Sequence, residues 1–98
     1  MKNLISKLNK AFESRIRLGI MSILMVNDRV DFNTLKELLE TSDGNLASHL
    51  RSLENGQMIE VEKKFVGRKP KTSYKVTPLG KKLFKQHIDA LEELIRNE

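Results

Sequence analysis

The residues that could do chemistry are concentrated in one short segment, TSDGNLASHLRSLENG at residues 41–56. Its leucines recur at intervals of four and three, which places Leu46, Leu50 and Leu53 on one stripe of a helix. A solvated helix face would usually carry Lys and Glu, because Asn and Ser favour caps and turns. The other side of this helix instead carries small polar residues and an arginine: Asn45, Ser48, Arg51 and Ser52. These side chains offer hydrogen-bond donors and acceptors, so the segment predicts a binding surface.

Patterns typical of catalysis or metal binding do not occur elsewhere. The chain has two His and no Cys, and no carboxylate pair flanks a Gly-rich turn. No triad, zinc-ligand spacing or phosphate-binding loop can be assembled from these residues. We therefore expect neither an enzyme nor a metal or cofactor site.

The basic residues are unevenly distributed. The formal net charge is +5, and nine of the 18 Lys and Arg lie between residues 63 and 85, where there is no Asp or Glu. A charge run alone fits a solvated face as well as a binding site. A localised excess of this kind favours a polyanionic partner.

The length and the N-terminus limit the class of protein. Ninety-eight residues make one domain, residues 1–98, with no room for a separate catalytic unit. The segment MKNLISKLNKAF has no continuous apolar run, so it predicts neither a signal peptide nor a membrane span. We expect a cytoplasmic protein with no membrane partner.

Helical periodicity and turn residues predict the elements that position the polar segment. A weak amphipathic helix is expected over residues 2–12, and Ser14 is expected to cap a second, largely apolar helix. Residues 29–32 read as extended, and Asn33 as the cap of a short helix that follows. A tight polar connection, residues 41–44, then leads into the helix at 43–55, which is the helix-turn-helix pattern.

Beyond Gly56 the pattern changes to that of a hairpin. Residues 58–66 and 72–77 alternate between apolar and polar, and the segment GRKPK between them predicts a charged turn. Thr77 and Pro78 are expected to cap and begin a long last helix over residues 79–98. The fold class is therefore mainly α with a small β-hairpin (α+β), a winged helix-turn-helix.

The segment TSDGNLASHLRSLENGQMIEVEKKFVGRKPKTSYKVTPLGKKLF resembles the DNA-binding core of small prokaryotic winged-helix regulators of the MarR-like and ArsR-like kind. The resemblance runs from about Ser14 to the C-terminus. It implies a transcriptional regulator that binds double-stranded DNA, with helix 43–55 in the major groove and the basic wing, residues 63–75, on the backbone or minor groove. The ArsR-like relatives that sense metals use thiols or clustered ligands, which this chain lacks.

The resemblance and the residue types together predict the DNA contacts. A recognition helix needs short residues for close approach and polar ones for base edges, and Asn pairs with adenine and Arg with guanine. On a helical wheel, His49 lies at the edge of the leucine stripe, so the pattern fits packing within the domain as well as it fits a DNA contact. The predicted recognition-helix contacts are Gly44, Asn45, Ala47, Ser48, His49, Arg51 and Ser52. The predicted wing and backbone contacts are Lys63, Lys64, Arg68, Lys69, Lys71, Asn33 and Thr34.

The terminal helices carry more apolar residues than one small core would cover. In the last helix, apolar residues recur at intervals of four, three and four positions, which forms a stripe on one face. We therefore expect a homodimer formed by residues 1–12 and 79–98. The alternative is a long last helix that folds back on its own domain. The predicted interface residues are Leu4, Leu8, Phe12, Phe84, Ile88, Leu91 and Ile95. No effector is indicated, and a pocket for one could form only at the dimer interface.

Two functions remain open from the sequence. The first is a sequence-specific regulator, expected to be a repressor because a small dimer can exclude polymerase by occupying DNA. The second is a winged-helix module that binds another protein through its terminal helices, with RNA or nonspecific nucleic-acid binding as a secondary property.

Overall fold

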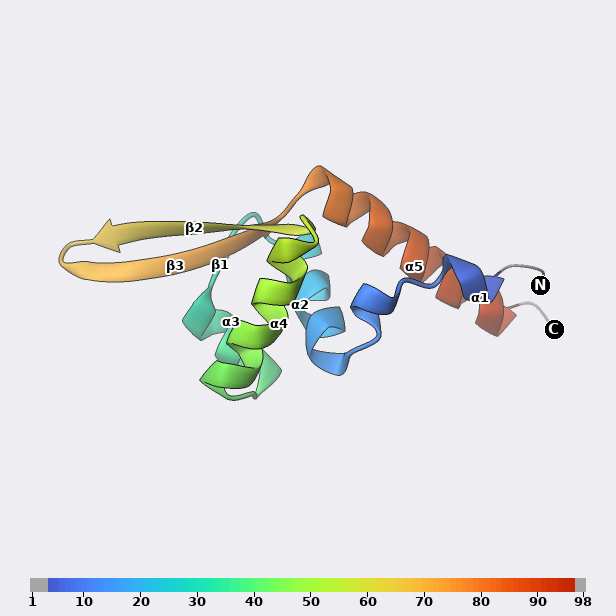
Figure 1. The fold of residues 1–98 in the computed structure, drawn as a ribbon, viewed down its shortest axis with the longest axis horizontal. Helices are drawn as coiled ribbons and strands as arrows, with labels where there is room; N and C mark the ends of the chain where they lie inside the picture. Colours follow the sequence, from blue (N-terminus) through green and yellow to red (C-terminus); the bar gives the residue numbers. More distant parts are fainter. Residues whose placement is uncertain (1–3, 97–98) are drawn as a thin grey trace.

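The computed structural model describes residues 4–96 and has an elongated shape of 56 × 25 × 21 Å. The hairpin and the last helix extend in opposite directions from a central group of helices (Figure 1). The elements in order are α1 (Leu4–Lys7), η1 (Lys10–Phe12), α2 (Arg15–Met25), β1 (Val30–Asp31), α3 (Phe32–Leu39), α4 (Asp43–Asn55), β2 (Ile59–Val66), β3 (Lys69–Val76) and α5 (Pro78–Arg96). The predicted winged helix-turn-helix, mainly helical with a hairpin, is confirmed.

Helix α2 forms the centre of the core. It begins where predicted, because Oγ of Ser14 accepts a hydrogen bond from the backbone amide of Arg17 at 3.3 Å. Ile20 and Met21 are fully buried, and Leu24 is 1% exposed. A helix that is apolar on most of its circumference must be covered on most sides. The other helices and the sheet supply that cover.

The helix-turn-helix consists of α3 and α4, joined by three residues. Glu40 ends α3 in the left-handed conformation with φ of 48°. Ser42 then caps α4, and its Oγ accepts a hydrogen bond from the amide of Asn45 at 3.2 Å. The leucine stripe is buried as predicted, with Leu46 fully covered. The predicted bounds of the recognition helix, 43–55, are confirmed.

The start of α3 differs from the prediction. Asp31, not Asn33, is the cap, and its carboxylate accepts a hydrogen bond from the amide of Thr34 at 2.8 Å. Hydrogen bonding by the side chain and then by the backbone amide of Thr34, helped by the cation of Lys71, lowers the pKa of Asp31 below its ordinary value. Asp31 can cap the helix because its backbone is extended, with φ of −82° and ψ of 164°. Phe32 therefore belongs to the helix and not to the strand.

The sheet has three antiparallel strands in the order β1-β3-β2. The hairpin is longer and its turn is tighter than the sequence suggested, because Val66 pairs with Lys69 and only Gly67 and Arg68 lie between the strands. Gly67 has φ of +67°, which suits the first turn position of a type II′ hairpin. Much of the predicted GRKPK turn is therefore strand, including Pro70 opposite Phe65.

The N-terminal segment and α5 pack against each other. The predicted helix 2–12 is two short turns, because the side chain of Asn9 caps η1 by accepting a hydrogen bond from the amide of Ala11 at 2.9 Å. Helix α5 begins at Pro78, behind the predicted cap Thr77, whose Oγ1 accepts a hydrogen bond from the amide of Gly80 at 2.9 Å. Residues 2–3 and 97–98 of the two predicted terminal helices lie outside the described part of the chain.

Part of the predicted dimer interface lies in the chain's own core. Leu4, Phe12 and Phe84 are at most 5% exposed, and the rings of Phe12 and Phe84 meet edge to face at 5.1 Å. The cause is that α5 and the N-terminal segment cover each other within one chain. Leu8 is half-buried, whereas Ile88, Leu91 and Ile95 remain exposed. The dimer stays a prediction, which now rests on these three residues of α5.

Candidate nucleic-acid interface

The polar face of α4 is open to solvent. In Figure 1, α4 lies in front of α2, so its leucine stripe is turned inward and its polar residues face outward. Of the predicted recognition-helix contacts, Ala47 and His49 are half-buried. The exposed ones are Gly44, Asn45, Ser48, Arg51 and Ser52.

Two polar contacts organise the N-terminal end of α4. The side-chain amide of Asn45 donates a hydrogen bond to Oγ1 of Thr41 at 2.8 Å, which holds it beside the cap. Lys36 of α3 pairs with Asp43 at 2.8 Å and so compensates the negative charge at this end. Both groups of the ion pair are well exposed, so the pair contributes little to stability. Its effect is to make the end of α4 less repulsive to a polyanion.

Gly44 has no structural reason to be glycine. A Cβ built at this position would meet no atom of the protein within 4 Å, and its φ is not positive. Glycine in a helix costs about 0.5–1 kcal/mol relative to alanine. A small residue here leaves α4 free to approach a partner closely.

Arg17 is a member of this surface that the sequence did not reveal. Its Nε donates a hydrogen bond to Nδ1 of His49 at 3.0 Å, which joins the start of α2 to the middle of α4. The acceptor role of Nδ1 places the hydrogen of the neutral ring on Nε2. His49 is thus a half-buried residue that positions a cation. The contact spans 32 positions of the chain, and no local pattern reports it.

The wing presents its cations to solvent. All five of its predicted contact residues are exposed: Lys63, Lys64, Arg68, Lys69 and Lys71. Lys64 and Lys71 face each other across the strands and are each near an acid, Glu62 at 3.6 Å and Asp31 at 3.8 Å. The other three form no ion pair with any residue between positions 4 and 96. They are therefore available to phosphates.

Asn33 and Thr34, the predicted DNA-backbone contacts at the start of α3, are exposed but differ in whether they are free to bind a phosphate. The amide of Thr34 already donates to the carboxylate of Asp31, so it is not free for a phosphate. Asn33 is exposed and borders a hollow of about 410 Å³ together with Lys63, Lys71 and Asp31. Two cations and one acid thus line the gap between α3 and the wing.

Comparison with known proteins identifies the family. The sequence profile of the winged helix DNA-binding domain matches residues 16–95. The chain belongs to this family. The match includes both helices of the helix-turn-helix, the whole wing and all of α5 except its last residue.

Relatives of this winged helix protein match it over nearly their full lengths. It is 36% identical over 88 residues to an uncharacterised protein of Methanocaldococcus jannaschii, covering 90% of this chain and 96% of that one. A transcriptional regulator homologue from Pyrococcus horikoshii OT3 has 28% identity and a TM-score of 0.87, with 97% and 95% of the two chains covered. A MarR-family regulator from Porphyromonas gingivalis W83 shares the fold with a TM-score of 0.70, at 21% identity and with 91% and 86% covered.

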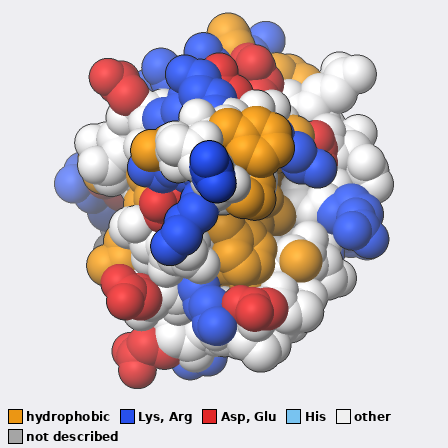
Figure 2. Space-filling model, turned by 90° about the vertical axis from the view of Figure 1, so that its left-hand side faces the viewer, with side chains coloured by type: hydrophobic (Ala, Val, Ile, Leu, Met, Phe, Trp, Pro, Cys, Tyr) orange, Lys and Arg blue, Asp and Glu red, His pale blue; other side chains and the backbone are white. Residues whose placement is uncertain are grey.

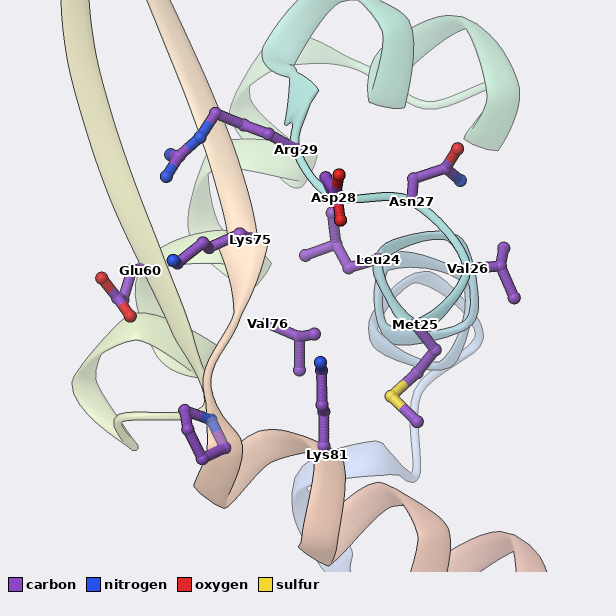
Figure 3. A pocket seen from close by; sticks show the side chains of 11 residues that line it. Leu24, Met25, Val26, Asn27, Asp28, Arg29, Glu60, Lys75, Val76 and Lys81 are labelled. Carbon is purple, nitrogen blue, oxygen red and sulfur yellow. The ribbon is translucent and has the colours of Figure 1, made fainter.

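A separate hollow of the winged helix domain lies away from the polar face of α4. It has a volume of about 580 Å³ and is bounded by the end of α2, the base of the hairpin and the start of α5 (Figure 3). Lys81 and Val76 point into it, whereas Val26 points away. Its cations, Arg29, Lys75 and Lys81, face the acids Asp28 and Glu60. This mixed lining selects no single ligand class.

Other kinds of site were sought in the described residues. Between residues 4 and 96, no three His, Asp or Glu residues are grouped so that they could hold a metal ion. No helix in the same range is both long and apolar enough to cross a membrane. The fold is that of a winged helix DNA-binding domain.

Proposed function

We propose that this winged helix protein is a sequence-specific regulator of transcription that binds double-stranded DNA as a homodimer. The observation that carries the proposal is the open polar face of α4 beside a wing whose outer cations are unpaired within the described residues. Ordinary packing explains neither feature. Gly44 supports the proposal, because its missing side chain leaves room only for something outside the chain.

The residue types suggest a division of labour. Arg51 can pair with guanine and Asn45 with adenine, provided that Asn45 exchanges its bond to Thr41 for one to the base. Ser48 is short and can form a hydrogen bond with either base. Arg68 and Lys69 attract phosphates without reading sequence, so they supply affinity and salt dependence. Arg17, held by His49, adds a cation at the side of the recognition helix.

The dimer would place two copies of α4 on one face of the duplex. Ile88, Leu91 and Ile95 form an exposed stripe on α5, with Ile95 at 83% exposure. Pairing of two such stripes fits a two-fold axis and half-sites about one DNA turn, roughly 34 Å, apart. A pseudo-palindromic site follows from that symmetry.

The proposed outcome of binding is repression in the cytoplasm. A bound dimer can block polymerase by occupying its site. The alternative is a protein-interaction module, which the same exposed stripe on α5 also favours. Under that alternative, α5 would contact a different protein and the wing would bind nucleic acid weakly.

One experiment separates the two functions. Selection from random duplexes, followed by fluorescence anisotropy over a salt series, measures both preference and charge contacts. For a regulator, log K should fall with log salt with a slope of about −0.9 for each phosphate contacted, and one sequence should be enriched. Weak binding with a flat salt response and no enriched sequence would instead support the interaction module.

A further inference from the structure

Two large apolar side chains are exposed at the end of the wing. Phe65 is 76% exposed and Val66 is 62% exposed, at the last two positions of β2. The hairpin extends away from the helices in the direction opposite to α5 (Figure 1), and these two residues lie near its turn. Exposed apolar groups gathered in one place mark a contact site.

Phe65 and Val66 point to opposite faces of the hairpin. Phe65 is paired with Pro70, while Val66 is paired with Lys69. Residues two apart along a strand share a face, so Phe65 lies on the same face as Val61 and Ile59, which turn toward the helices. Pro70 borders the hollow beside the start of α3. Phe65 is therefore on the side where a duplex held by α4 would pass.

The charge around Phe65 identifies the kind of partner. No acid occurs from residue 63 to residue 88. Lys63, Arg68 and Lys69, which form no ion pair within the described residues 4–96, lie on the same hairpin. Viewed from this end, hydrophobic side chains gather near the centre with Lys and Arg beside them (Figure 2). Apolar residues flanked by cations complement a polyanion with an apolar interior. Duplex DNA has stacked bases between two lines of phosphates.

We propose that Phe65, supported by Pro70, inserts as an apolar wedge between two base pairs of the minor groove while Arg68 and Lys69 hold the flanking phosphates. Phe and Pro are both residue types that unstack base steps in this way, and the result is a kink toward the major groove. The step entered should be a flexible pyrimidine–purine step, TA or CA/TG, because these unstack most easily. This inference rests on the proposed DNA-binding function and adds a shape-reading contact to it.

The test uses the full chain and the duplex enriched by selection, with 2-aminopurine placed singly at each position under the wing. Wild-type protein should raise the fluorescence at one step, and energy transfer between labelled duplex ends should report a bend. Phe65→Ala should abolish both signals and weaken binding about tenfold, within the range for loss of an aromatic contact to bases. The salt slope should not change, because no charge is removed.

Two further variants test whether the effect depends on the face of the hairpin and on an apolar side chain at position 65. Val66→Ala removes another exposed apolar side chain from the opposite face and should leave the bend, the fluorescence and the affinity unchanged. Phe65→Leu keeps an apolar wedge and should retain most of the bend. Because both residues are exposed, all three variants should unfold at the wild-type temperature.

The outcomes separate this inference from the proposed function. If wild type binds no duplex, both fail. If wild type binds a preferred site but Phe65→Ala binds and bends it equally well, the wedge alone is refuted. Loss of binding to phosphatidylglycerol vesicles in Phe65→Ala, with DNA binding intact, would likewise refute the wedge and assign the wing end to a membrane surface.

Discussion

The backbone amide of Asn9 donates a hydrogen bond to Nδ1 of His87 across 2.9 Å, which ties the N-terminal segment to α5. His87 is only 4% exposed, and its ring packs edge to face on Phe12 at 5.4 Å. Because Nδ1 accepts a hydrogen bond, the ring must be neutral in this arrangement. His87 therefore lies inside the chain's own core.

The protein should lose stability as His87 becomes protonated. Burial lowers the pKa of His87 below its ordinary value of 6.5, against a smaller opposing effect of Glu13. A His with a lowered folded-state pKa contributes stability that is complete above 6.5 and is lost as the pH falls from there through the lowered pKa. Urea unfolding at about pH 7.5 and about pH 5 should therefore give a smaller free energy of unfolding at the lower pH.

The control for this prediction is His87→Gln. Its side-chain oxygen can accept the hydrogen bond from Asn9 but does not titrate in this range. Every other group is the same in both proteins, so the difference between them isolates His87. Equal pH dependence in the two proteins would contradict the assignment.

Gly44→Ala should change stability and DNA binding in opposite directions. The added methyl group meets no protein atom, and a helical alanine is more stable than glycine by about 0.5–1 kcal/mol. The same methyl group would stand between α4 and the floor of the major groove and weaken binding to the selected duplex. Thermal unfolding and anisotropy on the same samples measure both effects.

Ser22→Ala is the matched control for Gly44→Ala. It is another helix-favouring substitution at an exposed position, on α2 and outside the predicted DNA contacts. It should leave DNA affinity unchanged. A Gly44→Ala protein that binds DNA as well as wild type would remove the support that Gly44 gives to the proposed function.

Local patterns predicted the elements that form the candidate site. The leucine stripe and the tight polar connection at residues 41–44 lie within or beside α4, so their effects can be read from neighbouring residues. The same holds for Ser14 and α2. Asp31 was missed because Asp and Asn are equally good caps, and only the backbone around each residue shows which is used.

Contacts between distant segments could not be predicted in this way. Phe12 and Phe84 follow amphipathic patterns that show only which face is apolar, not what covers it. The covering partner proved to be another part of the same chain. Arg17 and His49 likewise meet only because α2 and α4 pack side by side.

Arg51→Ala and Lys69→Ala should separate sequence reading from general affinity. Loss of a paired contact to a base costs about 1–3 kcal/mol of discrimination, so Arg51→Ala should flatten the preference at one position. Lys69→Ala should weaken binding to all duplexes alike and reduce the salt slope by about 0.9. Anisotropy on the selected duplex and on single-position variants of it, over a salt series, measures both quantities.

Lys82→Ala tests whether the loss of any exposed cation, whatever its position, changes DNA binding. Lys82 is an exposed cation on α5, outside the wing. Its loss should leave both the preference and the salt slope close to wild type. The division between helix and wing would be wrong if Arg51→Ala and Lys69→Ala changed the two quantities in the same way.

A charged substitution on α5 should separate the proposed dimer into folded monomers. Ile95 is 83% exposed, so aspartate at this position removes little packing within the chain but opposes the pairing of two apolar stripes. Sedimentation should change from the mass of a dimer to that of a monomer. Affinity for the two-fold site should fall far more than affinity for a single half-site, because only a dimer contacts both halves at once.

Leu38→Asp tests whether this effect belongs to the α5 stripe or to exposed leucines in general. Leu38 is 60% exposed on α3, and the substitution adds the same charge without touching α5. It should leave the sedimentation mass of the dimer unchanged.

A wild-type protein that sediments as a monomer when bound to its selected duplex would exclude the two-fold arrangement. If the Ile95→Asp variant remained dimeric, the interface would have to lie elsewhere. A monomeric Ile95→Asp variant that keeps wild-type half-site affinity would establish that the polar face of α4 and the wing bind DNA without the second subunit.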